Sequence, residues 1–200
     1  RVRNNAFDQA TIEAGIGRAH ELGKQFFLAC NLIPHGSKVE TFIQDIEPFI
    51  TLQPDAMIMA DPGLIMMVRE RWPEVSVHLS VQANTMNAAA VRFWQSVGVS
   101  RIILSRELSL DEIEEIRQAC PDMELEVFVH GALCIAYSGR CLLSGYMSHR
   151  DANQGSCTNS CRWDYKLRPA ASVADAEQPQ IRHSAADEPW LLEETQRPGE

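Results

Sequence analysis

Hydrophobic and polar positions alternate along residues 8–129 in a way that predicts a strand followed by a helix, repeated five times. The expected strands are short and apolar, and they occupy residues 24–31, 55–61, 75–82, 100–107 and 124–130. Between them the apolar positions recur every three or four residues, as on one face of an amphipathic helix. Units of this kind, repeated at about 20–30 residues, are typical of a parallel sheet.

Several residues predict where the helices begin. Asp8 stands where the first helix should start, and Asp61 is followed by Pro62, a residue favoured in the first helical turn. Ser109 and Glu112 have the S-x-x-E spacing of a capping box before an apolar run. These start signals agree with the expected strand–helix order.

The strands read as near-continuous apolar runs, which fits a sheet buried on both faces. A (β/α) barrel is favoured over a doubly wound sheet, because no G-x-G-x-x-G turn follows any expected strand. Five strands are too few to close an eight-stranded barrel. We therefore expect an α/β fold in which residues 1–130 form a partial, TIM-barrel-like parallel sheet, or an open sheet.

The pattern changes after the fifth strand. Residues 131–166 are rich in Gly, Ser, Asn and Cys and are expected to form a cysteine-rich cofactor-binding segment. Residues 167–189 are acidic and poor in apolar side chains, which predicts a flexible linker, and residues 190–200 read as the start of a truncated C-terminal part. The opening RVRNNAF is not a signal peptide, and no apolar run is long enough to span a membrane, so we expect a fragment of a cytoplasmic protein.

Charge is distributed unevenly along the chain. The net charge is -9, which argues against a broadly basic nucleic-acid binder. Residues 140–168 nevertheless carry five basic and two acidic side chains. A local basic patch can still contact a phosphate backbone, although a solvated loop is the simpler interpretation. The candidate RNA contacts are Arg140, Arg150, Arg162 and Lys166.

Polar side chains gather where the expected strands end, which is where parallel α/β folds bind ligands. Arg106 has the planar cation that binds a carboxylate or phosphate, and His130 can move a proton near neutral pH. The alternative is that such residues cap helices or pair with one another. The candidate catalytic residues are Gln82, Arg106 and His130, and the candidate pocket residues are Asn31, Asp61, Asn84 and Glu107.

Four of the six cysteines fall within 28 residues with the spacing C-x6-C-x15-C-x3-C: Cys134, Cys141, Cys157 and Cys161. Four thiolates suit an iron–sulfur cluster or a structural zinc, and one helical turn would place the last two on one side. Only that last pair has the tight spacing of a zinc knuckle, so a cluster is favoured. Cys30 and Cys120 are most simply core residues.

Motifs of hydrolytic enzymes are absent from the sequence. It contains neither G-x-S-x-G nor H-E-x-x-H. Cys134 and His130 are four residues apart and would make a nucleophile–base pair. That interpretation leaves three neighbouring cysteines without a role.

The run ELEVFVHGALCIAYSGRCLLSGYMSHRDANQGSCTNSCRWDY resembles the signature region of the collagenase-like proteins of peptidase family U32. The stretches RVRNN, DPGLIMMVRERWP, HLSVQAN, SRELSLDEIEEIR and RPGE resemble the subgroup involved in tRNA hydroxylation. The similarity extends over nearly the whole chain outside the expected linker. Family members have a further strand–helix unit before RVRNN and continue past RPGE.

The resemblance implies an enzyme that forms 5-hydroxyuridine at the wobble position of tRNA, independently of O₂, in a prephenate-dependent pathway. It implies a 4Fe–4S cluster on Cys134, Cys141, Cys157 and Cys161. Related members act on rRNA or a ubiquinone precursor, and a few gave the family its peptidase label. Prephenate would be the hydroxyl donor. From their positions at the strand ends, rather than from the resemblance, we expect Arg106 to hold a substrate carboxylate and His130 to help in proton transfer. The alternatives are a peptidase with Cys134 or another thiol as its nucleophile, and a non-catalytic, zinc-stabilised RNA-binding module; the oligomeric state stays open.

Overall fold

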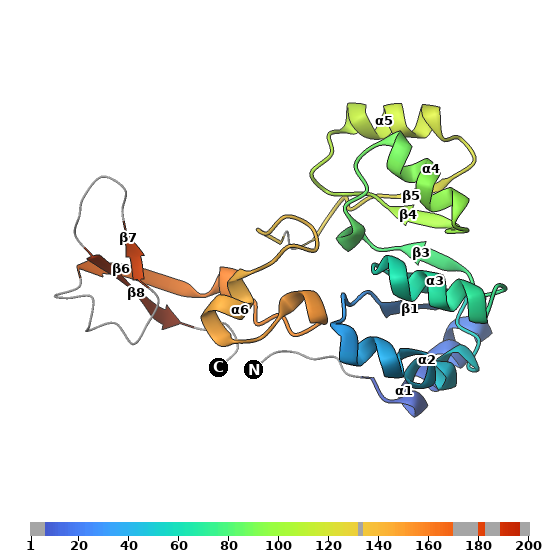
Figure 1. The fold of residues 1–200 in the computed structure, drawn as a ribbon, viewed down its shortest axis with the longest axis horizontal. Coiled ribbons are helices and arrows are strands. Elements are labelled where there is room, and N and C mark those ends of the chain that lie inside the picture. Colours follow the sequence, from blue (N-terminus) through green and yellow to red (C-terminus); the bar gives the residue numbers. More distant parts are fainter. Residues whose placement is uncertain (1–6, 132–133, 170–179, 183–188, 197–200) are drawn as a thin grey trace. The chain divides into compact units, whose positions relative to one another are not determined.

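The computed structural model describes residues 7–131, 134–169, 180–182 and 189–196, and its chain divides into two compact units (Figure 1). Residues 5–141 and 153–155 form the first, which we call the parallel-sheet unit. Residues 142–152 and 156–200 belong to the second, which we call the antiparallel-sheet unit. The chain thus leaves the first unit after Cys141 and returns to it briefly at Asn153.

The parallel-sheet unit alternates helices and strands as the sequence predicts. Its elements are α1 (Gln9–Glu21), β1 (Phe27–Cys30), α2 (Gly36–Ile50), β2 (Ala56–Met59), α3 (Pro62–Arg71), β3 (Val77–Leu79), the 3-10 helix η1 (Val81–Ala83), α4 (Ala88–Ser96), β4 (Arg101–Ile103), α5 (Leu110–Ala119) and β5 (Glu124–Glu126). Each strand lies within one of the five predicted segments. All neighbouring strands pair in parallel.

The strand order in this sheet is β1-β2-β3-β4-β5, the order of the chain itself. A doubly wound sheet reverses its strand order at a switch point, whereas a (β/α) barrel adds each strand beside the previous one. The α/β prediction is therefore confirmed, and the order is that of a barrel segment. In the part of the chain that the structure describes, β1 and β5 are the two edges of this sheet.

The predicted helix starts are confirmed as side-chain caps. Asp8 accepts from the backbone N–H of Thr11 at 2.8 Å, and Asp61 accepts from that of Leu64 at 2.9 Å. Ser109 begins α5 with both hydrogen bonds of a capping box. These bonds satisfy N–H groups that the first turn of a helix leaves without partners. Among the described residues, every helix is too short or too polar to cross a lipid bilayer.

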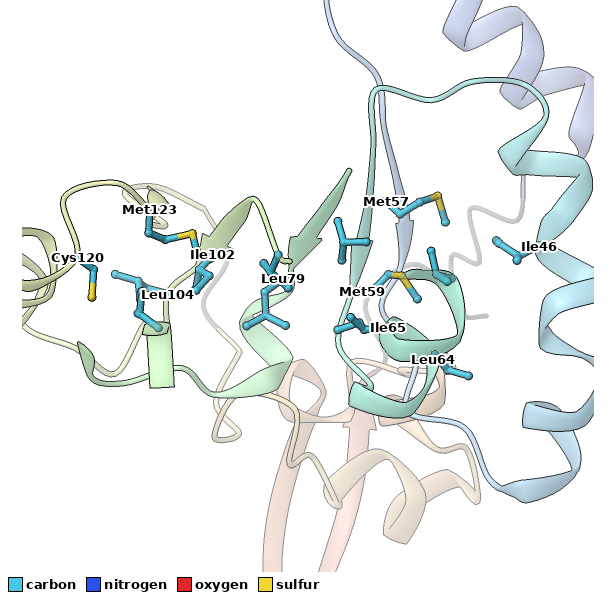
Figure 2. Packing of buried hydrophobic residues seen from close by; sticks show 14 of the residues in the cluster. Ile46, Met57, Met59, Leu64, Ile65, Leu79, Ile102, Leu104, Cys120 and Met123 are labelled. Carbon is cyan, nitrogen blue, oxygen red and sulfur yellow. The ribbon is translucent and has the colours of Figure 1, made fainter. Parts of the chain in front are cut away.

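The core lies between the parallel sheet and its helices (Figure 2). Alternate strand residues point into it, so Met57 and Met59 of β2 and Leu79 of β3 are fully buried. Ile102 extends the cluster on β4, where Cys120 at the end of α5 joins it, as the sequence predicts. The intervening strand residues point to the other face of the sheet, where Ala56 of β2 and His78 of β3 are also buried.

That other face carries polar and aromatic side chains from β1, β3, β4 and β5. His78 packs edge-on against Phe27 with ring centroids 4.7 Å apart, and the Arg101 guanidinium stands 5.0 Å from the Phe27 centroid. Arg101 also pairs with Glu124 and Glu126. Burial and the nearby Arg101 lower the pKa of His78. None of these residues is among the predicted pocket residues, and their contacts are with one another, so we assign them a structural role.

The antiparallel-sheet unit contains α6 (Leu143–Ser148), the 3-10 helix η3 (Ser160–Arg162) and the strands β6 (Asp164–Pro169), β7 (Gln180–Arg182) and β8 (Pro189–Gln196). The strand order is β6-β8-β7, with Leu167 opposite Leu192 and Ile181 opposite Trp190. The predicted linker over 167–189 is wrong at its described positions, because backbone pairing with 189–196 holds residues 167–169 and 180–182 in strands. The rest of that segment lies outside the described residues.

Candidate functional site

A pocket of about 370 Å³ opens at the carboxyl ends of β3, β4 and β5 in the parallel-sheet unit. It is lined by Val81, Arg106, Phe128, Val129, His130, Gly131 and Cys134. Two predicted catalytic residues, Arg106 and His130, therefore share one cavity with a predicted cluster ligand. This is the end of a parallel sheet at which ligands ordinarily bind.

Arg106 makes contacts with the backbone that the sequence did not predict. Its Nη2 atom donates to the carbonyl oxygens of Ala136 at 2.5 Å and Cys134 at 3.3 Å, and its side chain is only 16% exposed. The guanidinium thus holds the backbone on both sides of residue 135. The sequence favoured a substrate carboxylate as its partner, but loop carbonyls satisfy part of that donor capacity.

Glu107 fastens the same loop further along. Its carboxylate accepts from the Ser138 backbone N–H at 3.0 Å and from the hydroxyls of Ser105 and Ser138. Burial raises the pKa of Glu107, but these hydrogen bonds outweigh it and hold the pKa below its ordinary value. Glu107, predicted as a pocket residue, is not part of the pocket lining. It anchors the loop that supplies Cys134.

Gln82 packs against this loop, and neither Gln82 nor Asn84 is part of the pocket lining. A Cβ atom at Gly139, which has φ +68°, would stand 2.3 Å from the Gln82 carbonyl oxygen, so the two backbones pack directly together. Asn84 ends η1 in the left-handed conformation. Among the described residues, the buried side-chain oxygens of Gln82, Asn84 and Thr85 have no hydrogen-bond partner. The predicted catalytic role of Gln82 therefore gains no support from position.

Asn31 and Asp61 also fall outside the pocket. Asn31 donates to the Ser80 hydroxyl at 3.4 Å. The Asp61 carboxylate is used as the cap of α3. For these two residues, and for Arg106 with Glu107, the simpler alternative of capping and internal pairing describes what the structure shows.

Cys141 is held by an amide clamp. Asn153 Oδ1 accepts from the Cys141 N–H at 3.1 Å, and Asn153 Nδ2 donates to the Cys141 carbonyl at 2.9 Å. The Asn153 carbonyl in turn accepts from the Ile33 N–H at 3.0 Å. Asn153 thus ties the Cys141 backbone to the loop after β1. No motif pointed to Asn153, because both partners are backbone groups.

The loop of Cys157 and Cys161 is held by buried hydroxyls in the antiparallel-sheet unit. Thr158 Oγ1 lies 2.9 Å from Ser144 Oγ, 3.1 Å from Ser148 Oγ and 2.6 Å from Ser160 Oγ. Ser144 and Ser160 are both 2% exposed. This network, which we call the hydroxyl cluster (Ser144, Ser148, Thr158 and Ser160), joins α6 to the segment between the two cysteines.

The expected helical turn through Cys157 and Cys161 is wrong. Only Ser160–Arg162 forms a helix, because Asn159 has a left-handed backbone with φ +57°. Instead, the Asn159 backbone N–H donates to Cys157 Sγ at 3.4 Å. An N–H···S hydrogen bond of this kind stabilises a metal-bound thiolate.

The donor chemistry of the four cysteines suits a metal cofactor. None of the cysteines forms a disulfide, and Cys134, Cys157 and Cys161 are exposed. The first two of the four belong to the parallel-sheet unit and the last two to the antiparallel-sheet unit. Within the described ranges, no three His, Cys, Asp or Glu side chains form a group able to hold a metal ion. Ligation by all four therefore stays a prediction.

Replacement of Thr158 by Val is expected to weaken this loop. Valine keeps the shape but leaves the hydroxyls of Ser144, Ser148 and Ser160 without their common partner, at a cost of about 1–3 kcal/mol. Thermal unfolding should therefore begin at a lower temperature, and the iron of the predicted cluster should pass to a chelator about tenfold faster. Thr158→Ser retains the hydroxyl and is the matched control. Equal behaviour of the Val and Ser variants would show that the hydroxyl cluster does not hold the loop.

The predicted RNA contacts are divided between the units. Arg140 is exposed and donates to the carbonyl of Gly139, and Arg162 is exposed on η3. Arg150 is half-buried. The backbone of Lys166 lies in β6, and its side chain is outside the described residues. Their contact with RNA stays a prediction.

Comparison with known proteins gives a consistent family assignment. Residues 1–196 match the model of peptidase family U32. The chain is 53% identical to the tRNA hydroxylation protein P of Escherichia coli and 52% identical to that of Haemophilus influenzae, over its whole length and 47% of each relative. It is 37% identical to a 23S rRNA 5-hydroxycytidine synthase of Escherichia coli, over 75% of the chain and 22% of that protein.

One solved structure supports the fold. A U32 peptidase superposes with a TM-score of 0.51 at 17% identity, covering 60% of this chain and 51% of that one. The chain spans about half the length of the first two relatives.

The pocket contains both Cys134 and His130. In the described residues no hydrogen bond joins these two side chains, as one would join a nucleophile to its base.

Proposed function

The chain belongs to peptidase family U32, and we propose that it takes part in hydroxylating a uridine of tRNA rather than in proteolysis. The observation that carries the proposal is identity above 50%, along the whole chain, to two proteins named for tRNA hydroxylation. The pocket adds support, because it joins a basic and a titratable side chain to a cysteine of the predicted ligand set. If tRNA is the substrate, we expect the protein to act in the cytoplasm.

We propose the 4Fe–4S cluster on Cys134, Cys141, Cys157 and Cys161. Their free thiols, and the N–H···S bond to Cys157, support this assignment. When bound, such a cluster supplies one-electron transfer. The clamp at Asn153 and the hydroxyl cluster would set the backbone of the ligand loops before metal arrives.

The proposed reaction converts the C5–H bond of uridine to C5–OH, a two-electron oxidation of the ring. If the hydroxyl comes from prephenate, written R–OH, the products are the ring C–OH and R–H. The donor then gains the two electrons that the ring loses, and free O₂ is not consumed. His130 lines the pocket and makes no hydrogen bond in the described part of the chain, which suits it to hold or move a proton there. Arg106 keeps the loop of Cys134 in place, and the prephenate site is not assigned.

The RNA would meet the chain through exposed cations. Arg140 and Arg162 are candidates for phosphate contacts, since each has an exposed side chain. Each phosphate contact contributes affinity that falls as salt rises. Arg150 and Lys166 remain in the proposed set on their charge and position in the sequence alone.

Deletion of the gene should lower 5-hydroxyuridine and its derivatives in total tRNA, measured by nucleoside mass spectrometry. Growth without oxygen removes any oxygen-dependent route that would mask the loss. A gene copy carrying Cys30→Ser should restore the modification, whereas one carrying Cys134→Ser should not. Unchanged 5-hydroxyuridine in the anaerobic deletion strain would contradict the proposal. Peptide cleavage that survives complete metal removal would favour the peptidase.

A further inference from the structure

Phe128 is an aromatic side chain that the fold leaves outside its core. It follows β5, where Leu125 and Val127 pack against the core and Phe128 takes the alternate face. Its side chain is 61% exposed and lines the pocket beside Val81 and Val129. Exposed apolar groups gathered in a concave site, with polar groups at the rim, are the usual composition of a ligand pocket.

The charge of the lining limits what the pocket can take. Among the described lining residues, Arg106 is the one permanently cationic side chain, and its Nη2 atom is engaged by two carbonyl oxygens. The Glu107 carboxylate lies 4.0 Å from the same nitrogen. A ligand with two carboxylates would meet one partly neutralised cation. An uncharged planar ring would instead meet an aromatic side chain, two valines and the imidazole of His130, which has no hydrogen-bond partner among the described residues.

The cavity is large enough to take a single ring. A volume of about 370 Å³ is near the lower end of the range for small-molecule sites. A base enters such a pocket only when it is turned out of its stack, and proteins then hold it between aromatic and apolar side chains. Phe128 offers the stacking face, Val81 and Val129 offer apolar walls, and His130 offers ring nitrogens to the edge of the base.

We propose that this pocket binds the uracil ring that becomes hydroxylated, extruded from the RNA, and that Phe128 is its stacking platform. The inference rests on the proposed function and adds the place and orientation of the base. Loss of base stacking typically weakens single-stranded binding by about tenfold or more. Phe128 lies outside the predicted cysteine ligands, so its replacement should leave metal content unchanged.

Photocrosslinking tests the proposal directly. The full-length protein, with its iron–sulfur cluster assembled under anaerobic conditions, is irradiated with a tRNA that carries 5-iodouridine at the wobble position. The adduct is then mapped by mass spectrometry. The wild type should give an adduct at Phe128, and Phe128→Tyr should still crosslink. In Phe128→Leu the crosslinking yield should fall about tenfold or more. Phe93→Leu is the matched control, because Phe93 is 55% exposed on α4, outside this pocket.

The iron content of all four proteins should be the same, which separates base binding from folding. An adduct that maps away from the pocket, no adduct in the wild type, or an undiminished yield in Phe128→Leu would overturn the proposal. Its failure is distinct from failure of the proposed function. In the first case deletion of the gene still lowers 5-hydroxyuridine, and in the second it does not.

Discussion

Replacement of any one of Cys134, Cys141, Cys157 and Cys161 by Ser is expected to lower the iron content of anaerobically prepared protein by tenfold or more. Iron–sulfur clusters are held by thiolates, and a serine hydroxyl stays protonated near neutral pH and cannot take that place. Metal analysis of the four single variants measures the effect. Equal losses would show that the four act as one ligand set, since a cluster is lost when one of its ligands is removed.

Cys30→Ser is the matched control for this series. Cys30 ends β1 and packs against the hydrophobic core, and burial raises the pKa of its thiol to about 11. A thiol that stays protonated at neutral pH is a poor metal ligand. Iron content should therefore match that of the wild type, and a loss equal to that of Cys134→Ser would contradict the ligand assignment.

Among substitutions outside the cysteines, Gly139→Ala is expected to have the largest effect on stability and iron content. The new Cβ would meet the Gln82 backbone, with its oxygen at 2.3 Å and Cα at 3.0 Å, and neither can rotate away. The turn must therefore move away from Gln82, which breaks the hydrogen bonds between Ser138 and Glu107. It also displaces Cys141, which lies two residues after Gly139. Crowding and the left-handed φ together should cost about 2–4 kcal/mol of folding free energy. Thermal unfolding and iron content should both fall.

Gly23→Ala separates the crowding from the backbone strain. Gly23 has φ +64°, nearly the value at Gly139, but a Cβ there would meet no atom within 4 Å. This variant should lose only about 1–2 kcal/mol of folding free energy, which is the cost of placing an alanine in the left-handed conformation. Equal destabilisation of the two variants would show that the contact between Gly139 and Gln82 is not what holds the cysteine loop.

The repeated part of the fold follows from the sequence because its signals are local. Met57 and Met59 alternate toward the core, and Ser109 with Glu112 closes a capping box within four residues. Patterns of this kind depend only on the strand and helix periods and on backbone N–H groups nearby. They identify each element without knowledge of its neighbours.

The candidate site is less predictable because it depends on distant backbone partners. Arg106 was assigned to a substrate, yet it reaches the carbonyls of Cys134 and Ala136, about 30 residues further along the chain. Asn153 binds both backbone groups of Cys141, and composition gives no signal for such a clamp. Phe128 had one usable signal, since the alternation in ELEVFV places it opposite Leu125 and Val127.

The antiparallel sheet was missed for a related reason. Residues 167–189 are acidic and poor in apolar side chains, which is the composition of a linker. Nevertheless β6 ends and β7 lies within that segment, because β8 provides hydrogen-bond partners on both of its edges. Backbone pairing does not require an apolar sequence, so composition alone could not detect it.

Iron and acid-labile sulfide analysis of protein purified without oxygen tests the central claim most directly. The account predicts about four irons and four sulfides per chain, with a broad brown absorbance near 400 nm. A colourless protein with one zinc per chain and no sulfide would contradict it and favour a zinc-stabilised module.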